Sequence, residues 1–301
     1  MRAAIGACLA LTCVLSQFAL AQKPDTGTAI NTQEAAEQPD TASAADEKPW
    51  TISITLDVPT QYFYRGYNVV SKGWIVQPGI NFSYTVYDAN GLTITPHVAG
   101  WFNLTEEKGP NDPQHFAEAD LFTGVGFGYA NFELLIDYNF QGYPSRFGIA
   151  EGSGQIQEAE FVLSYDDSSH WPDSSPLAGI YPHIGYYREL EDRNDHDRNA
   201  YVEVGVEPSL RDFSLGGERA LTISFPLIVG LSADGYYHDA AGGNETLGYW
   251  LAGVKASIAL DKHWTIIGEV DYLRLQATSV LDANGGDGDE VIARIGVAAS
   301  L

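Results

Sequence analysis

Alternation of apolar and polar residues recurs along this chain and constrains its fold more than any motif does. In the segment 264–272 the even-numbered positions carry Trp, Ile, Gly, Val and Tyr, whereas the odd-numbered positions carry Thr, Ile, Glu and Asp. A period of two places the two sets on opposite faces of a β-strand, so the faces meet different environments. After residue 21 no segment approaches the roughly 20 apolar residues of a transmembrane helix. The pattern therefore indicates strands that separate an apolar medium from a polar one.

Twelve segments show this pattern or a close variant of it. They cover residues 50–64, 73–87, 91–104, 116–129, 131–142, 155–166, 177–189, 199–211, 220–232, 246–260, 264–278 and 289–301. An even number of strands leaves both chain ends on one side of a membrane, as in single-chain outer-membrane barrels. We predict an all-β fold, an up-and-down antiparallel transmembrane β-barrel of about 12 strands.

The connections between these segments alternate in length. Short turns are expected at 88–91, 130–131 and 261–263, and longer polar loops at 105–115, 144–154, 190–198, 233–245 and 279–288. Short periplasmic turns opposite long outer loops are typical of such barrels, although 167–176 and 212–219 are long for the periplasmic side. Aromatic residues collect near the expected strand ends, which favours belts in the headgroup layer. They are Trp50, Tyr84, Tyr87, Trp101, Phe102, Tyr129, Tyr143, Tyr165, Tyr186, Tyr187 and Trp264.

Prolines inside the expected strands conflict with an unbroken barrel, because each removes a donor from the hydrogen-bonded ladder. They are Pro78, Pro96, Pro182, Pro208 and Pro226. We expect bulges or strand rims at these positions.

The N-terminal segment divides into two parts before the barrel. Residues 1–21 have a short basic start, an apolar core and an Ala-Leu-Ala cleavage motif, which predicts a secretory signal peptide. Residues 22–49 are rich in small and polar residues, which predicts a disordered periplasmic tail ahead of a barrel at 50–301. Both cysteines, Cys8 and Cys13, lie in the expected signal. The mature chain would then have no disulfide, no thiolate metal site and no cysteine nucleophile.

The chain is strongly acidic, with 40 Asp and Glu against 16 Lys and Arg and a formal net charge of −24. This balance argues against nucleic acid as a partner, since phosphates bind basic surfaces. It is compatible with outer-membrane lipid and with lipopolysaccharide bridged by divalent ions, and it also serves solubility.

If the apolar face meets lipid, the opposite face lines the barrel interior and carries mainly carboxylates. The residues expected to line a pore are Asp57, Glu118, Asp120, Glu133, Asp137, Glu158, Glu160, Glu203, Glu207, Glu269, Asp271 and Arg294, with Glu290 on the same face. The other basic candidates there are Arg211, His97 and His183. Such an interior would enrich cations. Alternatively, Arg294 pairs with Glu269 and Asp271, and the charges serve only structure.

A short motif follows the first expected strand. The stretch 60–66 reads Thr-Gln-Tyr-Phe-Tyr-Arg-Gly, and 76–84 reads Val-Gln-Pro-Gly-Ile-Asn-Phe-Ser-Tyr. These residues resemble the opening of the TorF-type porin family, whose aromatic-x-aromatic-Arg-Gly element is matched by Tyr62, Tyr64, Arg65 and Gly66. The resemblance implies an outer-membrane barrel with porin activity and no catalytic residues. We expect Arg65 to anchor the first loop at the barrel mouth through stacking on the flanking tyrosines and a carboxylate pair, with Asp57 as one candidate partner.

No arrangement of residues points to an enzyme, a cofactor or a metal. His115, His196 and His238 fall in expected outer loops, but the chain has no Gly-x-Ser-x-Gly nucleophile elbow. The Gly- and Asp-rich stretch 282–290 could offer oxygen ligands to calcium, yet it departs from the EF-hand pattern.

The sequence supports a channel for small solutes that favours cations. Two alternatives stay open: a non-conducting barrel whose loops bind a ligand, a partner or lipopolysaccharide, and a soluble periplasmic β-sandwich.

Overall fold

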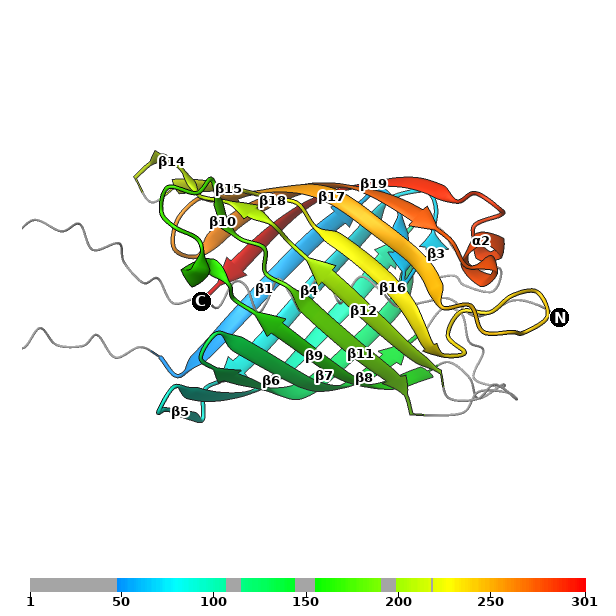
Figure 1. Cartoon of the computed structure of the whole chain (residues 1–301), viewed down its shortest axis with the longest axis horizontal. Helices are drawn as coiled ribbons and strands as arrows, with labels where there is room; N and C mark the ends of the chain where they lie inside the picture. The colour runs from blue at the N-terminus through cyan, green and yellow to red at the C-terminus, as the bar shows by residue number, and fades with distance from the viewer. Residues whose placement is uncertain (1–47, 107–114, 144–154, 191–198, 218) are drawn as a thin grey trace, which may run out of the picture.

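The computed structural model describes residues 48–106, 115–143, 155–190, 199–217 and 219–301. The expected signal peptide and nearly all of the expected tail lie outside these residues. The described chain forms one closed antiparallel β-barrel (Figure 1). The first strand, β1 (Trp50–Pro59), pairs with the last, β19 (Asp289–Ser300), which closes the barrel.

Twelve spanning strands make the barrel, so the predicted fold class is confirmed. Between β1 and β19 these are β4 (Ile75–Tyr84), β6 (Leu92–Thr105), β7 (Phe116–Tyr129), β8 (Phe132–Gly142), β9 (Gln155–Tyr165), β10–β11 (Leu177–Gly179 and His183–Glu189), β12–β13 (Ala200–Val206 and Ser209–Leu210), β15–β16 (Arg219–Ser224 and Leu227–Asp234), β17 (Leu247–Ala259) and β18 (Trp264–Leu275).

Three of the prolines explain why three spanning strands are each divided into two segments. Pro182, Pro208 and Pro226 lie in the breaks between those segments. Each proline carbonyl still accepts a hydrogen bond from the adjacent strand, from the N–H groups of Tyr165, Phe225 and Gly253 respectively. The missing proline N–H is thus accommodated by a local interruption. Pro78 and Pro96 remain inside β4 and β6, and the structure offers no comparable explanation for them.

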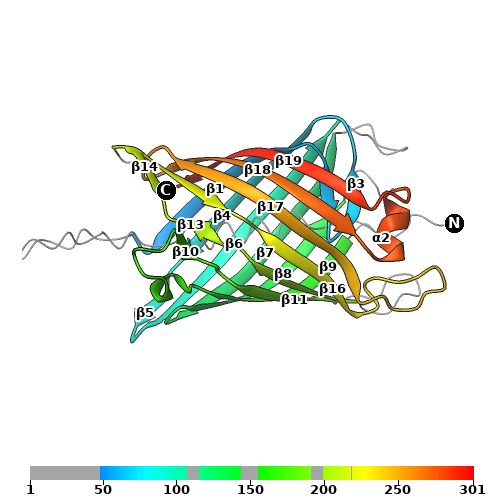
Figure 2. The ribbon, with the colours of Figure 1, turned by 45° about the horizontal axis from the view of Figure 1, so that its top comes forward.

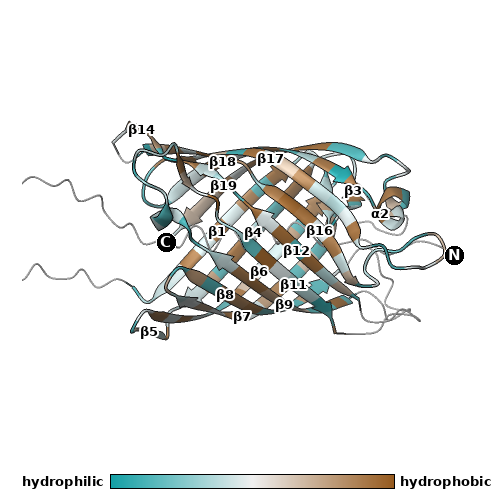
Figure 3. Ribbon diagram, viewed as in Figure 1, coloured by the Kyte–Doolittle hydropathy of each residue, from teal (hydrophilic) through white to brown (hydrophobic). Residues whose placement is uncertain are grey.

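The two faces of the wall differ as the alternation requires. Along β1, Ile54, Leu56 and Val58 are about 40 % exposed on the outside, whereas Thr55 and Asp57 are buried inside. Apolar residues recur along the strands of the barrel wall (Figure 3). A closed barrel with an apolar exterior and a polar interior contradicts the soluble sandwich. No described helix is long and apolar enough to cross a membrane.

The expected aromatic belts are only partly on the outside. Tyr84, Tyr129 and Trp264 are exposed, but Trp101, Tyr143 and Tyr187 are buried in the interior. Position near a strand end did not distinguish the two faces, because the face depends on residue parity along the strand.

Six short elements lie outside the spanning strands and were not predicted. They are the hairpin β2 (Tyr62–Tyr64) and β3 (Tyr67–Val70), β5 (Tyr87–Ala89), the 3-10 turn η1 (Ser168–His170), β14 (Phe213–Gly216) and α2 (Thr278–Ala283). β3 and α2 lie at the end opposite the C-terminus, whereas β5, η1 and β14 lie near it (Figures 1 and 2). The end that holds β3 and α2 is called the outer end below.

Candidate functional site: the barrel interior and its inward hairpin

The first outer loop folds back into the barrel as a two-stranded hairpin. β2 and β3 pair with each other and not with the barrel wall. Their two-residue turn has Arg65 at φ +46° and Gly66 at φ +82°. Positive φ at both central positions defines a type I′ turn, which suits the twist of a tight hairpin and favours Gly at its second position. The turn presents the Arg65 side chain to the interior.

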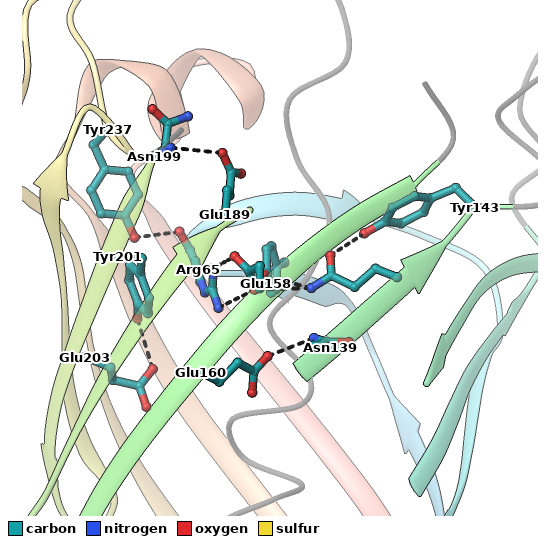
Figure 4. A network of polar contacts seen from close by, with 12 residues as sticks. Arg65, Asn139, Tyr143, Glu158, Glu160, Glu189, Asn199, Tyr201, Glu203 and Tyr237 are labelled. Atoms are coloured by element: carbon teal, nitrogen blue, oxygen red, sulfur yellow. Dashed lines mark hydrogen bonds and ion pairs between the residues drawn. The ribbon is translucent and has the colours of Figure 1, made fainter. Parts of the chain in front are cut away.

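Arg65 is the centre of a buried network that spans the lumen. Its side chain is almost fully buried, at 1 % exposed, and its two terminal nitrogens donate to Glu158 of β9 at 2.7 and 3.0 Å. Bidentate pairing fixes the plane of the guanidinium as well as its position. Four tyrosine rings lie within 5.4 Å of the guanidinium carbon, those of Tyr64, Tyr187, Tyr201 and Tyr236. Figure 4 shows Arg65 between Glu158 on one side and Tyr201 on the other.

The expected contacts of the motif are partly corrected. Stacking and a carboxylate pair both hold Arg65, but the partner is Glu158 and not Asp57, which lies 3.5 Å from Arg294. Tyr62 does not flank Arg65 either, since its hydroxyl donates to Glu118 and its ring packs on Trp101. Asp57 is only eight residues from Arg65 in the sequence, whereas 93 residues separate Arg65 from Glu158, so the sequence alone does not indicate this partner.

The back of the hairpin packs against the outer end of the barrel. The Tyr237 hydroxyl donates to the Arg65 carbonyl at 2.9 Å, and the Tyr67 hydroxyl contacts the Tyr236 carbonyl and Ser279, each at 3.1 Å. Burial raises the pKa of Tyr67 to about 12, because its phenolate would lose hydration. The hairpin is therefore fixed at its tip and along its length.

One wall of the interior, formed by β7, β8 and β9, is strongly acidic. It holds Glu118, Asp120, Asp137, Glu158 and Glu160, all buried. Asp137 pairs in register with Glu160 and lies 3.0 Å from His97. Among the described residues, Arg65 supplies a fixed positive charge to this wall through its ion pair with Glu158. In the part of the chain that the structure describes, this wall therefore carries more acidic than basic side chains.

The opposite wall carries a more balanced set of charges. Arg294 of β19 contacts Glu269 of β18 and lies near Asp57 of β1. Lys255 of β17 pairs with Glu207. We missed Lys255 at the sequence level, although its odd position in β17 places it on the same face as Gly253 and Leu251. The expected Arg294–Glu269 pair is present. Among the described residues, Arg294 forms its ion pairs with Glu269 and Asp57, and not with Asp271.

The remaining predicted residues lie at different levels of the barrel. Glu203 accepts hydrogen bonds from Tyr201 and Tyr249 and lies 3.4 Å from His183. Glu133 and Asp271 are half-buried on inward faces. Arg211 is outside the interior, because it lies beyond β13 and binds carbonyl groups near η1. Glu290 bonds to Asn284 and Gln61 at the outer end.

The histidines considered as catalytic or ligand-binding candidates in the outer loops make the following contacts. The His115 ring packs on Trp74. His238 lies in the loop before β17, where its backbone N–H donates to the Ser279 hydroxyl. His196 lies outside the described residues. In the part of the chain that the structure describes, no three His, Cys, Asp or Glu side chains converge as metal ligands. Whether the inward residues line a conducting pore stays a prediction.

No family model and no curated protein matches this chain. Among solved structures, an outer-membrane channel from Pseudomonas putida F1 superposes with a TM-score of 0.50 at 9 % identity, covering 88 % of this chain and all of the other. LpxR from Salmonella typhimurium gives 0.46 at 10 % identity, over 83 % and 99 % of the two chains. The NanC porin gives 0.43 at 11 % identity, over 82 % and 100 %. At such identities the similarity concerns the fold, and the chain has the architecture of an outer-membrane β-barrel.

Proposed function

We propose that this protein is an outer-membrane channel that passes small solutes and favours cations. The signal peptide expected at residues 1–21 would direct it there by export. Lipid and lipopolysaccharide are the partners proposed for its apolar exterior. The TorF-type porin resemblance belongs to the same proposal.

The observation that supports cation preference best is the charge of the β7–β9 wall. Asp120, Asp137 and Glu160 lie on it, and among the described residues none of these three forms an ion pair with Lys or Arg. In a confined space of low dielectric constant, such a group attracts cations and repels anions more strongly than it would in bulk water.

The inward hairpin is proposed to narrow the outer half of this path. The hairpin follows β1, but its tip reaches Glu158 of β9 and the tyrosines of β11 and β12. These three adjacent strands lie across the barrel from β1, so the hairpin crosses the interior and does not lie along one side. Solutes would then pass beside a fixed constriction next to the acidic wall. The constriction would select solutes of small size, and the acidic wall would select solutes of positive charge.

Removing charge from the wall tests this proposal. The double variant Asp120→Asn, Glu160→Gln keeps side-chain size and should lower the cation-to-anion permeability ratio measured from the reversal potential in planar bilayers. Asp88→Asn, at an exposed position of the short strand β5, is the matched control and should behave as wild type. An unchanged ratio in the double variant would contradict cation selection by this wall.

A non-conducting barrel that binds a ligand or partner is the second candidate. The dense packing of the hairpin around Arg65 favours it, because the same contacts that fix a constriction could also close the outer half. Correctly folded protein that shows no conductance, with or without Arg65, would favour this candidate.

A further inference from the structure

Several inward carboxylates lie sideways on the barrel wall, over a glycine of the adjacent strand. Asp57 pairs in register with Gly296, and Asp271 pairs with Gly253. A Cβ atom added to Gly296 would lie 2.1 Å from the Asp57 Oδ1 atom, and one added to Gly253 would lie 2.0 Å from the Asp271 Oδ1 atom. Each carboxylate therefore occupies the space that the side chain of its cross-strand neighbour would take.

Some other glycines in the barrel strands make no such close contact with a side chain of the adjacent strand. Gly126 also faces inward, on β7, but the nearest atom to its added Cβ is 3.7 Å away; around Gly268 no atom lies within 4 Å. Glycine is unfavourable in a strand interior because it adds backbone entropy to the unfolded chain and packs no side chain. A direct cross-strand contact gives Gly253 and Gly296 a specific role.

The two aspartates flank the Arg294–Glu269 pair. Asp57 lies 3.5 Å from Arg294, and Asp271 is two residues after Glu269 on the same face of β18. We propose that Gly253 and Gly296 are positioning residues that hold Asp271 and Asp57 against the wall, and that they thereby set the charge and the free width of the lumen. This inference rests on the proposed channel function.

A methyl group at either position forces the carboxylate to turn toward the barrel axis. In Gly296→Ala the displaced group is the end of the Asp57 side chain, since the nearest backbone atom, the Leu56 carbonyl oxygen, is 3.4 Å away. The barrel backbone can therefore remain in place while Asp57 moves away from Arg294. Conductance should fall because the side chain enters the path.

The test compares Gly296→Ala with Gly126→Ala, each alone and in an Asp57→Ala background. We expect Gly296→Ala to lower both single-channel conductance and the midpoint temperature of the folded band on a denaturing gel, with Gly126→Ala close to wild type. In the Asp57→Ala background, Gly296→Ala should cause no further shift, because the displaced group is gone. Equal effects of the two alanines, or additive effects of Gly296→Ala and Asp57→Ala on the midpoint, would overturn the inference.

Stability separates this inference from the channel proposal. If the wild type folds but does not conduct, the channel proposal fails, while the midpoint temperatures of the five variants, Asp57→Ala included, still show whether Gly296 positions Asp57. If the wild type conducts and the midpoints are non-additive but conductance is unchanged, the glycine positions the carboxylate without setting the lumen width, and that part is wrong.

Discussion

The guanidinium of Arg65, at the tip of the inward hairpin, binds both carboxylate oxygens of Glu158 on β9 at 2.7 and 3.0 Å. Both side chains are about 2 % exposed, and Glu158 also accepts hydrogen bonds from Tyr64 and Gln141. This contact joins the hairpin to the barrel wall, so the position of the hairpin inside the barrel depends on it.

Arg65→Ala should destabilise the barrel by about 3–5 kcal/mol, because it leaves the Glu158 carboxylate buried without its counter-charge. Urea unfolding in lipid or detergent, followed by tryptophan fluorescence, measures this loss. Arg188→Ala breaks the exposed Arg188–Asp234 pair and should cost no more than about 1 kcal/mol. Similar losses in the two variants would contradict a central role for the buried pair.

Gly66→Ala should be more harmful than Gly91→Ala, although both glycines have positive φ, +82° and +75°. Backbone strain of about 1–2 kcal/mol applies to both. Only at Gly66 would the new methyl group also meet packed atoms, of Tyr249, Val280 and Leu275 at 3.2–3.4 Å, which adds about 1–3 kcal/mol. Free energies of unfolding for the two variants decide this, and equal values would show that the hairpin is loosely packed.

The hairpin should become less stable in strongly alkaline solution through Tyr67. Its pKa is raised from 10.0 to about 12 in the folded protein, so the unfolded chain releases this proton first. The stabilisation is complete below pH 10 and is lost as the pH rises toward 12. Protease susceptibility of the hairpin against pH measures the effect. Tyr67→Phe should weaken the hairpin by about 1 kcal/mol, through lost hydrogen bonds, and should reduce this pH dependence; an unchanged profile would exclude Tyr67 as its source.

An arginine on the outer face should report the lipid environment. Val270, in the middle of β18, is 52 % exposed, and Val270→Arg should cost about 2–4 kcal/mol if this face meets the centre of a bilayer. Val86→Arg, in the turn beyond β4, should cost at most about 1 kcal/mol near the interface. Unfolding from lipid vesicles measures both, and a neutral Val270→Arg would contradict a membrane-facing wall.

The strands were predictable because a period of two is a local property. The segment 116–129 coincides with β7, where alternation is clear and a tight turn at Ala130 follows. The hairpin was not predictable in the same way. The prediction of one strand over 50–64 is wrong, because the chain leaves the wall after Pro59 and residues 62–64 form β2 of the hairpin.

The inward direction of the carboxylates follows from parity, but their partners do not. Arg65 binds Glu158, and Lys255 binds Glu207, through contacts that only the closed barrel creates. The register of Asp57 with Gly296 likewise requires the first and last strands to meet. Sequence reasoning could therefore place side chains on a face and predict the Arg294–Glu269 pair between neighbouring strands, but it could not predict these contacts between distant parts of the chain.

The reversal potential of the wild-type channel in a salt gradient tests the central claim most directly. The protein should first show a folded band that shifts on boiling, which establishes a closed barrel. We then predict a reversal potential whose sign indicates cation preference and whose size falls as salt screens the interior charges. Anion preference, or no conductance from a folded barrel, would contradict a cation-selective channel.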